Sequence, residues 1–176
     1  MANHRRNSVK GGCYFFTVNL TNRASRLLTE YIALLRQSIA HVMQNHLFQI
    51  DAMVVLPDHI HTILTLPEND ADFALRWWLI KTQISRHIEK TEKISKSRIN
   101  KGERGIWQRR YGERTIKDER DFSNHVDYIH INPVKHGYVF HPTEWPHSSI
   151  HKFIAAGKLP IDWACDKNAK LSYSHE

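Results

Sequence analysis

Hydrophobic residues recur along the chain with two different periods, which predict strands in some segments and helices in others. Residues 12–20 begin at a Gly-Gly break and are rich in aromatic and β-branched side chains, so they predict a strand. In residues 26–45 the hydrophobic positions follow the 3.6-residue period of an amphipathic helix. Residues 48–56 and 59–66 are short apolar segments separated by Pro57 and an aspartate, which indicates two strands joined by a tight connection.

The second half of the chain continues the alternation of helix and strand. Residues 70–91 carry hydrophobic residues at helical spacing behind an acidic start, which predicts a second helix. Residues 106–111 and 114–116 are expected to form a fourth strand, and residues 118–131 a third helix that ends before Pro133. The order β-α-β-β-α-β-α indicates an α+β domain of ferredoxin-like type, an antiparallel sheet with helices packed on one face.

Composition places the chain among ordinary globular proteins. It has 176 residues, of which 41% are hydrophobic and 24% charged, which suits a single core. We expect one domain over residues 1–156 and a C-terminal extension over residues 157–176. The apolar runs are far shorter than the roughly 20 residues that cross a bilayer, and the first residues have positive charge without an apolar stretch behind them. We therefore expect no signal peptide, no membrane partner and a cytoplasmic, nucleoid-associated protein.

The charge balance predicts a polyanionic partner. Lys and Arg number 25 against 18 Asp and Glu, a net charge of +7. Residues 81–120 hold thirteen of these cations against six acids, interleaved with Trp107 and Tyr111, which suits phosphate contacts combined with base stacking. A solvated helix face and a flexible loop would explain several of the lysines between residues 90 and 101 equally well. The candidate DNA-binding residues are Arg5, Arg6, Lys10, Lys81, Arg86, Trp107, Arg109, Arg110, Arg114 and Lys117.

Two histidines form the sharpest local feature. Because side chains alternate across a strand, His59 and His61 project from the same face, with their imidazoles close enough to share one divalent metal. In a chain with 13 histidines such a pair can also arise by chance.

The predicted third helix carries a second candidate group. Its apolar stripe consists of Phe122, Val126 and Ile129. Tyr128 and Asn132 lie one turn apart on a different, mostly polar stripe, so a hydroxyl and an amide face the same spot. A surface tyrosine that makes one hydrogen bond, followed by an Asn-Pro helix stop, is the simpler interpretation of these residues alone.

Taken together, the features resemble the REP-associated tyrosine transposases, which are single-tyrosine HUH proteins related to the transposases of IS200/IS605 insertion sequences. The similarity extends over nearly the whole chain. The motifs that carry it are Lys10-Gly-Gly, Phe15-Phe-Thr-Val-Asn-Leu20, Val54-Val-Leu-Pro-Asp-His-Ile-His61, Ile106-Trp-Gln-Arg-Arg-Tyr111, Tyr128-Ile-His-Ile-Asn-Pro-Val-Lys-His-Gly-Tyr-Val139, Trp145-Pro-His-Ser-Ser149 and Pro160-Ile-Asp-Trp163.

The resemblance implies an HUH endonuclease-type domain with a metal and a tyrosine nucleophile. His59 and His61 match the metal-binding HUH histidines, and Asn132 matches the third ligand, where Gln is common in the insertion-sequence enzymes. The expected metal is Mg²⁺ or Mn²⁺, although histidine ligands alone leave Zn²⁺ open. Tyr128 matches the nucleophile, which forms a 5′-phosphotyrosine and frees a 3′-hydroxyl without ATP. An ordinary phenol is protonated at neutral pH, so we expect the metal or His125 to assist it.

The resemblance also implies the substrate. The family acts on short palindromic REP elements that form single-stranded DNA hairpins, which it binds, cleaves and rejoins. We expect this chain to act on such hairpins as a monomer. The alternative is a domesticated protein that binds palindromes without catalysis; an RNA-binding module is disfavoured because no RNP1-like or KH-type motif is present. Residues 89–104 form a longer basic link than compact members carry, which could alter hairpin choice, and the C-terminal extension could modulate the site.

Overall fold

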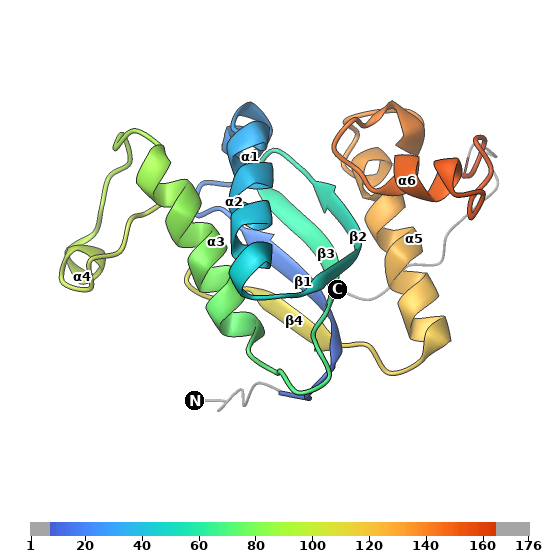
Figure 1. The fold of residues 1–176 in the computed structure, drawn as a ribbon. Coiled ribbons are helices and arrows are strands. Elements are labelled where there is room, and N and C mark those ends of the chain that lie inside the picture. The colour runs from blue at the N-terminus through green and yellow to red at the C-terminus, as the bar shows by residue number, and fades with distance from the viewer. Residues whose placement is uncertain (1–7, 165–176) are drawn as a thin grey trace, which may run out of the picture.

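The protein forms a four-stranded antiparallel sheet flanked by helices, in a computed structural model that describes residues 8–164 (Figure 1). Its elements are β1 (Cys13–Asn19), α1 (Leu27–Glu30), α2 (Ile32–Asn45), β2 (Gln49–Val55), β3 (His59–Thr65), α3 (Phe73–His87), α4 (Lys96–Ile99), β4 (Gly112–Thr115), α5 (Glu119–Lys135), the 3₁₀ turn η1 (Pro142–Glu144) and α6 (Ile150–Ala155). Within residues 8–164, no helix has the length and apolar character that spanning a membrane requires.

The strand order is β2-β3-β1-β4, and every pair of neighbours is antiparallel. This is the order of a ferredoxin-like sheet, so the predicted α+β class is confirmed. The two central strands β1 and β3 pair over their full length. Their register sets Thr17 opposite His61 and Asn19 opposite His59, which fixes the surroundings of the histidine pair.

One face of the sheet holds the larger core. Alternate residues of β1, among them Phe16 and Val18, are buried against α2 and α3, which supply residues such as Leu35, Trp77 and Ile80. The 3.6-residue period of both helices produces this contact, as expected from the sequence. Asp72 begins α3 by accepting a hydrogen bond from the backbone N–H of Leu75 at 2.9 Å, because a side-chain oxygen at this position satisfies an otherwise unpaired amide.

The opposite face is covered by α5, so the expectation that the helices share one face needs correction. Val126 and Ile129 of α5 pack on Ala52, Val54 and Ile63 of the sheet and form a second core. The physical reason is that β3 is buried along nearly its whole length, with no solvent-facing side. A strand of this kind needs cover on both faces.

The boundaries of two predicted elements also differ. The helix expected over residues 26–45 is split at Tyr31, whose φ of −104° and ψ of 31° depart from helical values. The fourth strand is Gly112–Thr115, which begins at the glycine between the two expected stretches, whereas in residues 106–111 only Trp107 makes an isolated bridge, to Leu20. Glycine is tolerated in β4 because this is an edge strand that needs to pair on one side only.

The third predicted helix was expected to end before Pro133, but α5 continues to Lys135. A proline in the last turn removes only one N–H, and the carbonyl oxygens around it are satisfied from beyond the helix. Tyr138 N–H donates to the Pro133 carbonyl at 3.0 Å, and Gly137 N–H donates to the Val134 carbonyl at 2.9 Å. Gly137 has a φ of +70°, the left-handed conformation that ends many helices. The extra turn carries Lys135 and the following histidine to the candidate site.

Candidate active site

Two buried histidines on β3 lie at the centre of the candidate site. His59 and His61 project from the same face of the sheet as Ile63, which is the face covered by α5. Their ring centroids are 4.8 Å apart. The spacing predicted from the strand alternation is therefore present, and it is short enough for both rings to bind one divalent cation.

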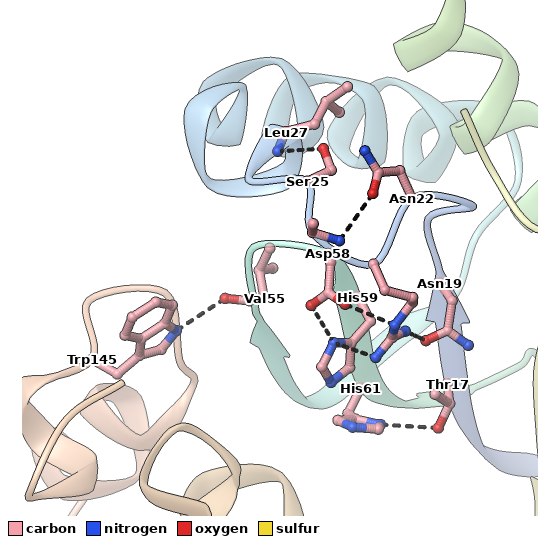
Figure 2. Close-up of polar contacts among 12 residues, drawn as sticks. Thr17, Asn19, Asn22, Ser25, Leu27, Val55, Asp58, His59, His61 and Trp145 are labelled. Atoms are coloured by element: carbon pink, nitrogen blue, oxygen red, sulfur yellow. Dashed lines mark hydrogen bonds and ion pairs between the residues drawn. The ribbon is translucent and has the colours of Figure 1, made fainter. Parts of the chain in front are cut away.

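Each of the two rings is held at one nitrogen. His59 Nδ1–H donates to Asp58 Oδ1 at 2.7 Å, and His61 Nδ1 is hydrogen-bonded to Thr17 Oγ1 at 2.9 Å (Figure 2). Such a second contact orients a histidine ring and sets which nitrogen is free to act as a ligand. In both rings that nitrogen is Nε2.

Asp58 and Arg23 complete this support, and the sequence reasoning missed both. Asp58 is buried, and its second carboxylate oxygen lies 2.8 Å from Arg23 Nε. The same guanidinium donates to the side-chain oxygen of Asn19, so it ties the end of β1 to the start of β3. The signal for Asp58 was its place directly before the first histidine, where a carboxylate can orient the ring. Arg23 lies in a polar turn and had no comparable signal.

Burial determines the protonation of the histidine pair. Desolvation lowers the pKa of His59, although its hydrogen bond to Asp58 acts in the opposite direction. The pKa of His61 lies well below its usual range, first because of burial and then because of the nearby His59. Both imidazoles are therefore neutral at pH 7, which is the form that binds a metal.

Helix α5 brings Tyr128 to this pair. The Tyr128 ring centroid is 5.2 Å from that of His61 and 5.9 Å from that of Phe15. Two turns later, the ring of His136 is 5.1 Å from that of His59. Lys135 Nζ lies 4.7 Å from the centroid of the Tyr128 ring, so a positive charge accompanies the hydroxyl-bearing side chain.

Asn132 lies on α5 midway between these two contacts. Residues four apart share one face of a helix, so Tyr128, Asn132 and His136 all face the histidine pair. The Asn132 side chain is 0% exposed. Among the described residues, neither its amide oxygen nor its amide nitrogen has a hydrogen-bond partner. An unpaired buried polar group costs about 1–3 kcal/mol of folding free energy. The Asn132 amide is therefore available to bind a ligand that the folded chain does not itself supply.

The donor set fits a divalent cation. It offers two neutral histidine nitrogens and one amide oxygen, a mixed set suited to a cation that keeps open positions for substrate. Across residues 8–164, no group of three or more His, Cys, Asp or Glu side chains is placed to hold a metal ion. A closed site of the structural zinc type is therefore absent from the described part of the chain.

His125 was considered as an assistant to the tyrosine. Its Nδ1–H donates to the backbone carbonyl of Asp121 at 2.7 Å, and its ring lies 4.7 Å from that of Phe15. Phe15 in turn contacts Tyr128, so His125 belongs to the same aromatic cluster. His61, Phe15 and Lys135 contact the Tyr128 ring directly.

The candidate DNA-binding residues differ in their exposure and in their partners. Arg5 and Arg6 lie outside the described residues. The exposed members are Lys10, Arg86, Arg109, Arg110, Arg114 and Lys117. Of these, Arg109 forms an ion pair with Glu103 at 2.6 Å, and Arg114 lies 3.3 Å from Asp121.

Trp107 and Lys81 take part in the core rather than the surface. The Trp107 side chain is 6% exposed, so its ring is not available to stack on an unpaired base. The Lys81 ammonium lies 5.6 Å from the Trp107 ring and 5.0 Å from the Tyr111 ring, and it donates to the Gln108 carbonyl. Trp107 was expected to stack on an unpaired base, and this expectation needs correction because its ring is buried in the larger hydrophobic core.

Comparison with known proteins shows the family of the chain. The sequence model of the family described as "Transposase IS200 like" matches residues 9–132. A REP-associated tyrosine transposase of Escherichia coli K12 is 46% identical over 166 residues, which cover 94% of this chain and 93% of that protein. A Haemophilus influenzae protein that carries the same family name is 43% identical over 172 residues, covering 97% of this chain and 98% of its own.

A solved structure matches over the same extent. It is described as a REP-associated tyrosine transposase bound to a REP hairpin, and it superimposes with a TM-score of 0.81 at 46% identity. The match covers 94% of this chain and 93% of that chain. The residues matched by the family model, 9–132, include His59, His61 and Tyr128.

Proposed function

Because this chain belongs to the REP-associated tyrosine transposases of the IS200-like family, we propose that it is a metal-dependent tyrosine endonuclease and strand transferase acting on single-stranded, REP-type DNA hairpins. The observation that carries the proposal is the placement of Tyr128 against His61, with the unpartnered amide of Asn132 one turn away. A protein that only binds DNA has no physical need for an unsatisfied buried amide beside two neutral histidines.

In the proposed reaction the Tyr128 hydroxyl oxygen attacks the scissile phosphorus. The bond from tyrosine oxygen to phosphorus forms while the bond from phosphorus to the 3′-oxygen breaks. The phenolic proton leaves, and the departing 3′-oxygen takes up a proton, so the products are a 5′-phosphotyrosine and a free 3′-hydroxyl. The phosphodiester energy is retained in the new bond, which allows rejoining without ATP.

The chain's own residues prepare this step. His59, His61 and Asn132 would hold a Mg²⁺ or Mn²⁺ ion, which would polarise the phosphate and offset its charge. Asp58 and Thr17 fix the two rings, so the ligand geometry is set before substrate arrives. Lys135 places a further positive charge beside Tyr128, where the negatively charged phosphate would bind.

The proposed substrate rests on two supports. The relative of known structure is described as bound to a REP hairpin, and the two chains are 46% identical. The net charge of +7 suits a nucleic acid partner. The expected monomer, the domain boundary at residue 157 and the nucleoid-associated location stay predictions.

The test is covalent capture. Purified protein is incubated with a labelled single-stranded REP-type hairpin from its own genome, with Mg²⁺ or Mn²⁺, and run on a denaturing gel. We expect a labelled band at the size of the protein that EDTA abolishes. Tyr128→Phe should lose the band, whereas Tyr31→Phe, which removes the hydroxyl of an exposed tyrosine between α1 and α2, should keep it.

The competing function is palindrome binding without catalysis. It predicts tight hairpin binding with no adduct and no cleavage in either metal, and equal affinity for the wild type and Tyr128→Phe. That result would replace the proposed enzyme with a DNA-binding regulator.

A further inference from the structure

A row of aromatic rings leads away from the histidine pair along the segment that follows α5. His136 lies 5.1 Å from His59 between ring centroids and 6.0 Å from Tyr138, nearly parallel to it with an interplanar angle of 26°. Tyr138 is 5.3 Å from Trp145, at an angle of 31°. We call His136, Tyr138 and Trp145 the aromatic row. It connects the candidate metal site to the surface.

The rings at the outer part of this segment are exposed although they are large and apolar. Tyr138 is 40% exposed, and Phe140, two residues further on, is 90% exposed. Most of residues 135–141 are exposed, and large apolar rings exposed together on one segment are typical of a binding surface.

The backbone that carries these rings is held in place, with Trp145 partly buried against the second core and Tyr138 and Phe140 left exposed. The Glu144 carboxylate accepts hydrogen bonds from the backbone N–H groups of Phe140 at 3.0 Å and His141 at 3.1 Å. Trp145 Nε1–H donates to the carbonyl of Val55 at 2.9 Å, which pins the end of the row to β2 (Figure 2). Rings presented on a fixed backbone bind a partner with little loss of conformational entropy.

Charges of both signs lie around the row. Burial and the nearby Asp58 raise the pKa of the Tyr138 hydroxyl, whereas Arg26 and Arg23, in the turn before α1, lower it, and Lys135 ends α5 just before the segment. Asp58 is paired with Arg23, and the Glu144 carboxylate accepts the backbone N–H groups of Phe140 and His141. Cations beside exposed aromatic faces are the combination that binds single-stranded nucleic acid, because the cations contact phosphates while bases stack on the rings.

We propose that the aromatic row and Phe140 bind unpaired bases of the DNA strand next to the phosphate that Tyr128 attacks, an inference that rests on the proposed function. The contact between His136 and His59 makes the row continuous with the reacting centre, so a strand whose phosphate lies there passes over it. Only unpaired bases offer their faces for stacking, which excludes the paired stem of the hairpin as the occupant.

The test compares two hairpins on Tyr128→Phe protein, which binds but does not react. One hairpin carries single-stranded flanks with normal bases, and the other carries flanks of the same length built from abasic nucleotides. We expect Phe140→Ala and Tyr138→Leu each to weaken binding of the first hairpin by about fivefold or more. Their affinity for the abasic hairpin should not change. Trp78→Ala, which removes a ring 59% exposed on α3, should change neither value.

The outcomes separate the inference from the function it rests on. Equal weakening on both hairpins, or none on either, overturns the stacking surface. A change of oligomeric state in Phe140→Ala, seen by analytical ultracentrifugation, would assign Phe140 to contact with a second copy of the chain and also overturn it. If the wild type forms no covalent adduct while the base-dependent loss persists, the proposed catalysis fails and the stacking surface stands. If the adduct forms without that loss, the stacking surface alone fails.

Discussion

Replacing Asn132 by leucine should stabilise the protein while abolishing its reaction. The Asn132 amide is buried and neither of its polar atoms has a partner among the described residues. Leucine has a similar shape and no polar atom, so the penalty of about 1–3 kcal/mol for an unpaired buried group disappears. We therefore expect the free energy of unfolding in EDTA to rise by about that amount.

The assay is urea unfolding followed by circular dichroism, with and without Mn²⁺. In EDTA Asn132→Leu should unfold at higher urea than the wild type, with an unchanged slope. Added Mn²⁺ should raise the stability of the wild type more than that of the variant, because a bound ligand stabilises only the state that binds it. The same variant should give no adduct on the denaturing gel.

Two further substitutions make the result specific. Asn132→Asp keeps a ligand oxygen but buries a charge, so it should be less stable than the wild type in EDTA and recover with Mn²⁺. Asn124→Leu changes an exposed asparagine of the same helix and should give no comparable gain. A loss of more than about 1 kcal/mol for Asn132→Leu in EDTA would show that the amide is satisfied in the folded protein, and the inference drawn from it would fall.

Three other predictions test separate parts of the structure. Burial lowers the pKa of His130 to about 4, so between that value and 6.5 the unfolded chain binds a proton that the folded chain does not, and stability falls as the pH falls. The stability difference between the wild type and His130→Gln should shrink by about 3 kcal/mol from pH 7 to pH 4 in urea titrations; a constant difference would contradict it. Asp58→Asn should weaken Mn²⁺ binding, measured by calorimetry, by about 10- to 100-fold, because His59 loses its orienting carboxylate; unchanged affinity would remove Asp58 from the site. Arg104 donates to backbone carbonyls at the end of α3 and pairs with Glu92, so Arg104→Ala should speed trypsin cleavage in residues 89–104, and an unchanged rate would count against this anchor.

The order of the elements could be predicted from the sequence because it depends on local periods. The aromatic and β-branched residues of 12–20 predicted a strand, and the 3.6-residue period of 26–45 predicted a helix with one buried face; both segments pack in the larger core. The placement of α5 on the opposite face depends on another segment. The burial of β3 on both sides required a second cover, and the available signal was that its apolar residues, Ile60, Ile63 and Leu64, fall on both faces of the strand.

The surface cations show a limit of sequence reasoning. Lysines and arginines between residues 89 and 110 are equivalent in a charge count, but in the structure they differ in their hydrogen-bond and ion-pair partners. Arg98 donates to the carbonyls of Arg104 and Trp107, Arg104 donates to those of Ile88 and Glu89, and Arg109 pairs with Glu103. The planar guanidinium can satisfy several carbonyls at once, which an ammonium does less well. These three arginines therefore stabilise the local structure, which a count of charges does not reveal.

The site depends on two structural features, the pairing register of β1 with β3 and the spacing of residues along α5. On the sheet, the pairing of β1 with β3 sets Thr17 beside His61, so the histidine pair is fixed by backbone hydrogen bonds. On α5, the four-residue spacing of Tyr128, Asn132 and His136 sets the tyrosine over one histidine and the last ring over the other. A helix that ended before Pro133 would have kept Tyr128 but lost the contact with His59. The continuation of α5 through the proline therefore brings the aromatic row into contact with the buried histidine pair, on the same helix that carries the amide.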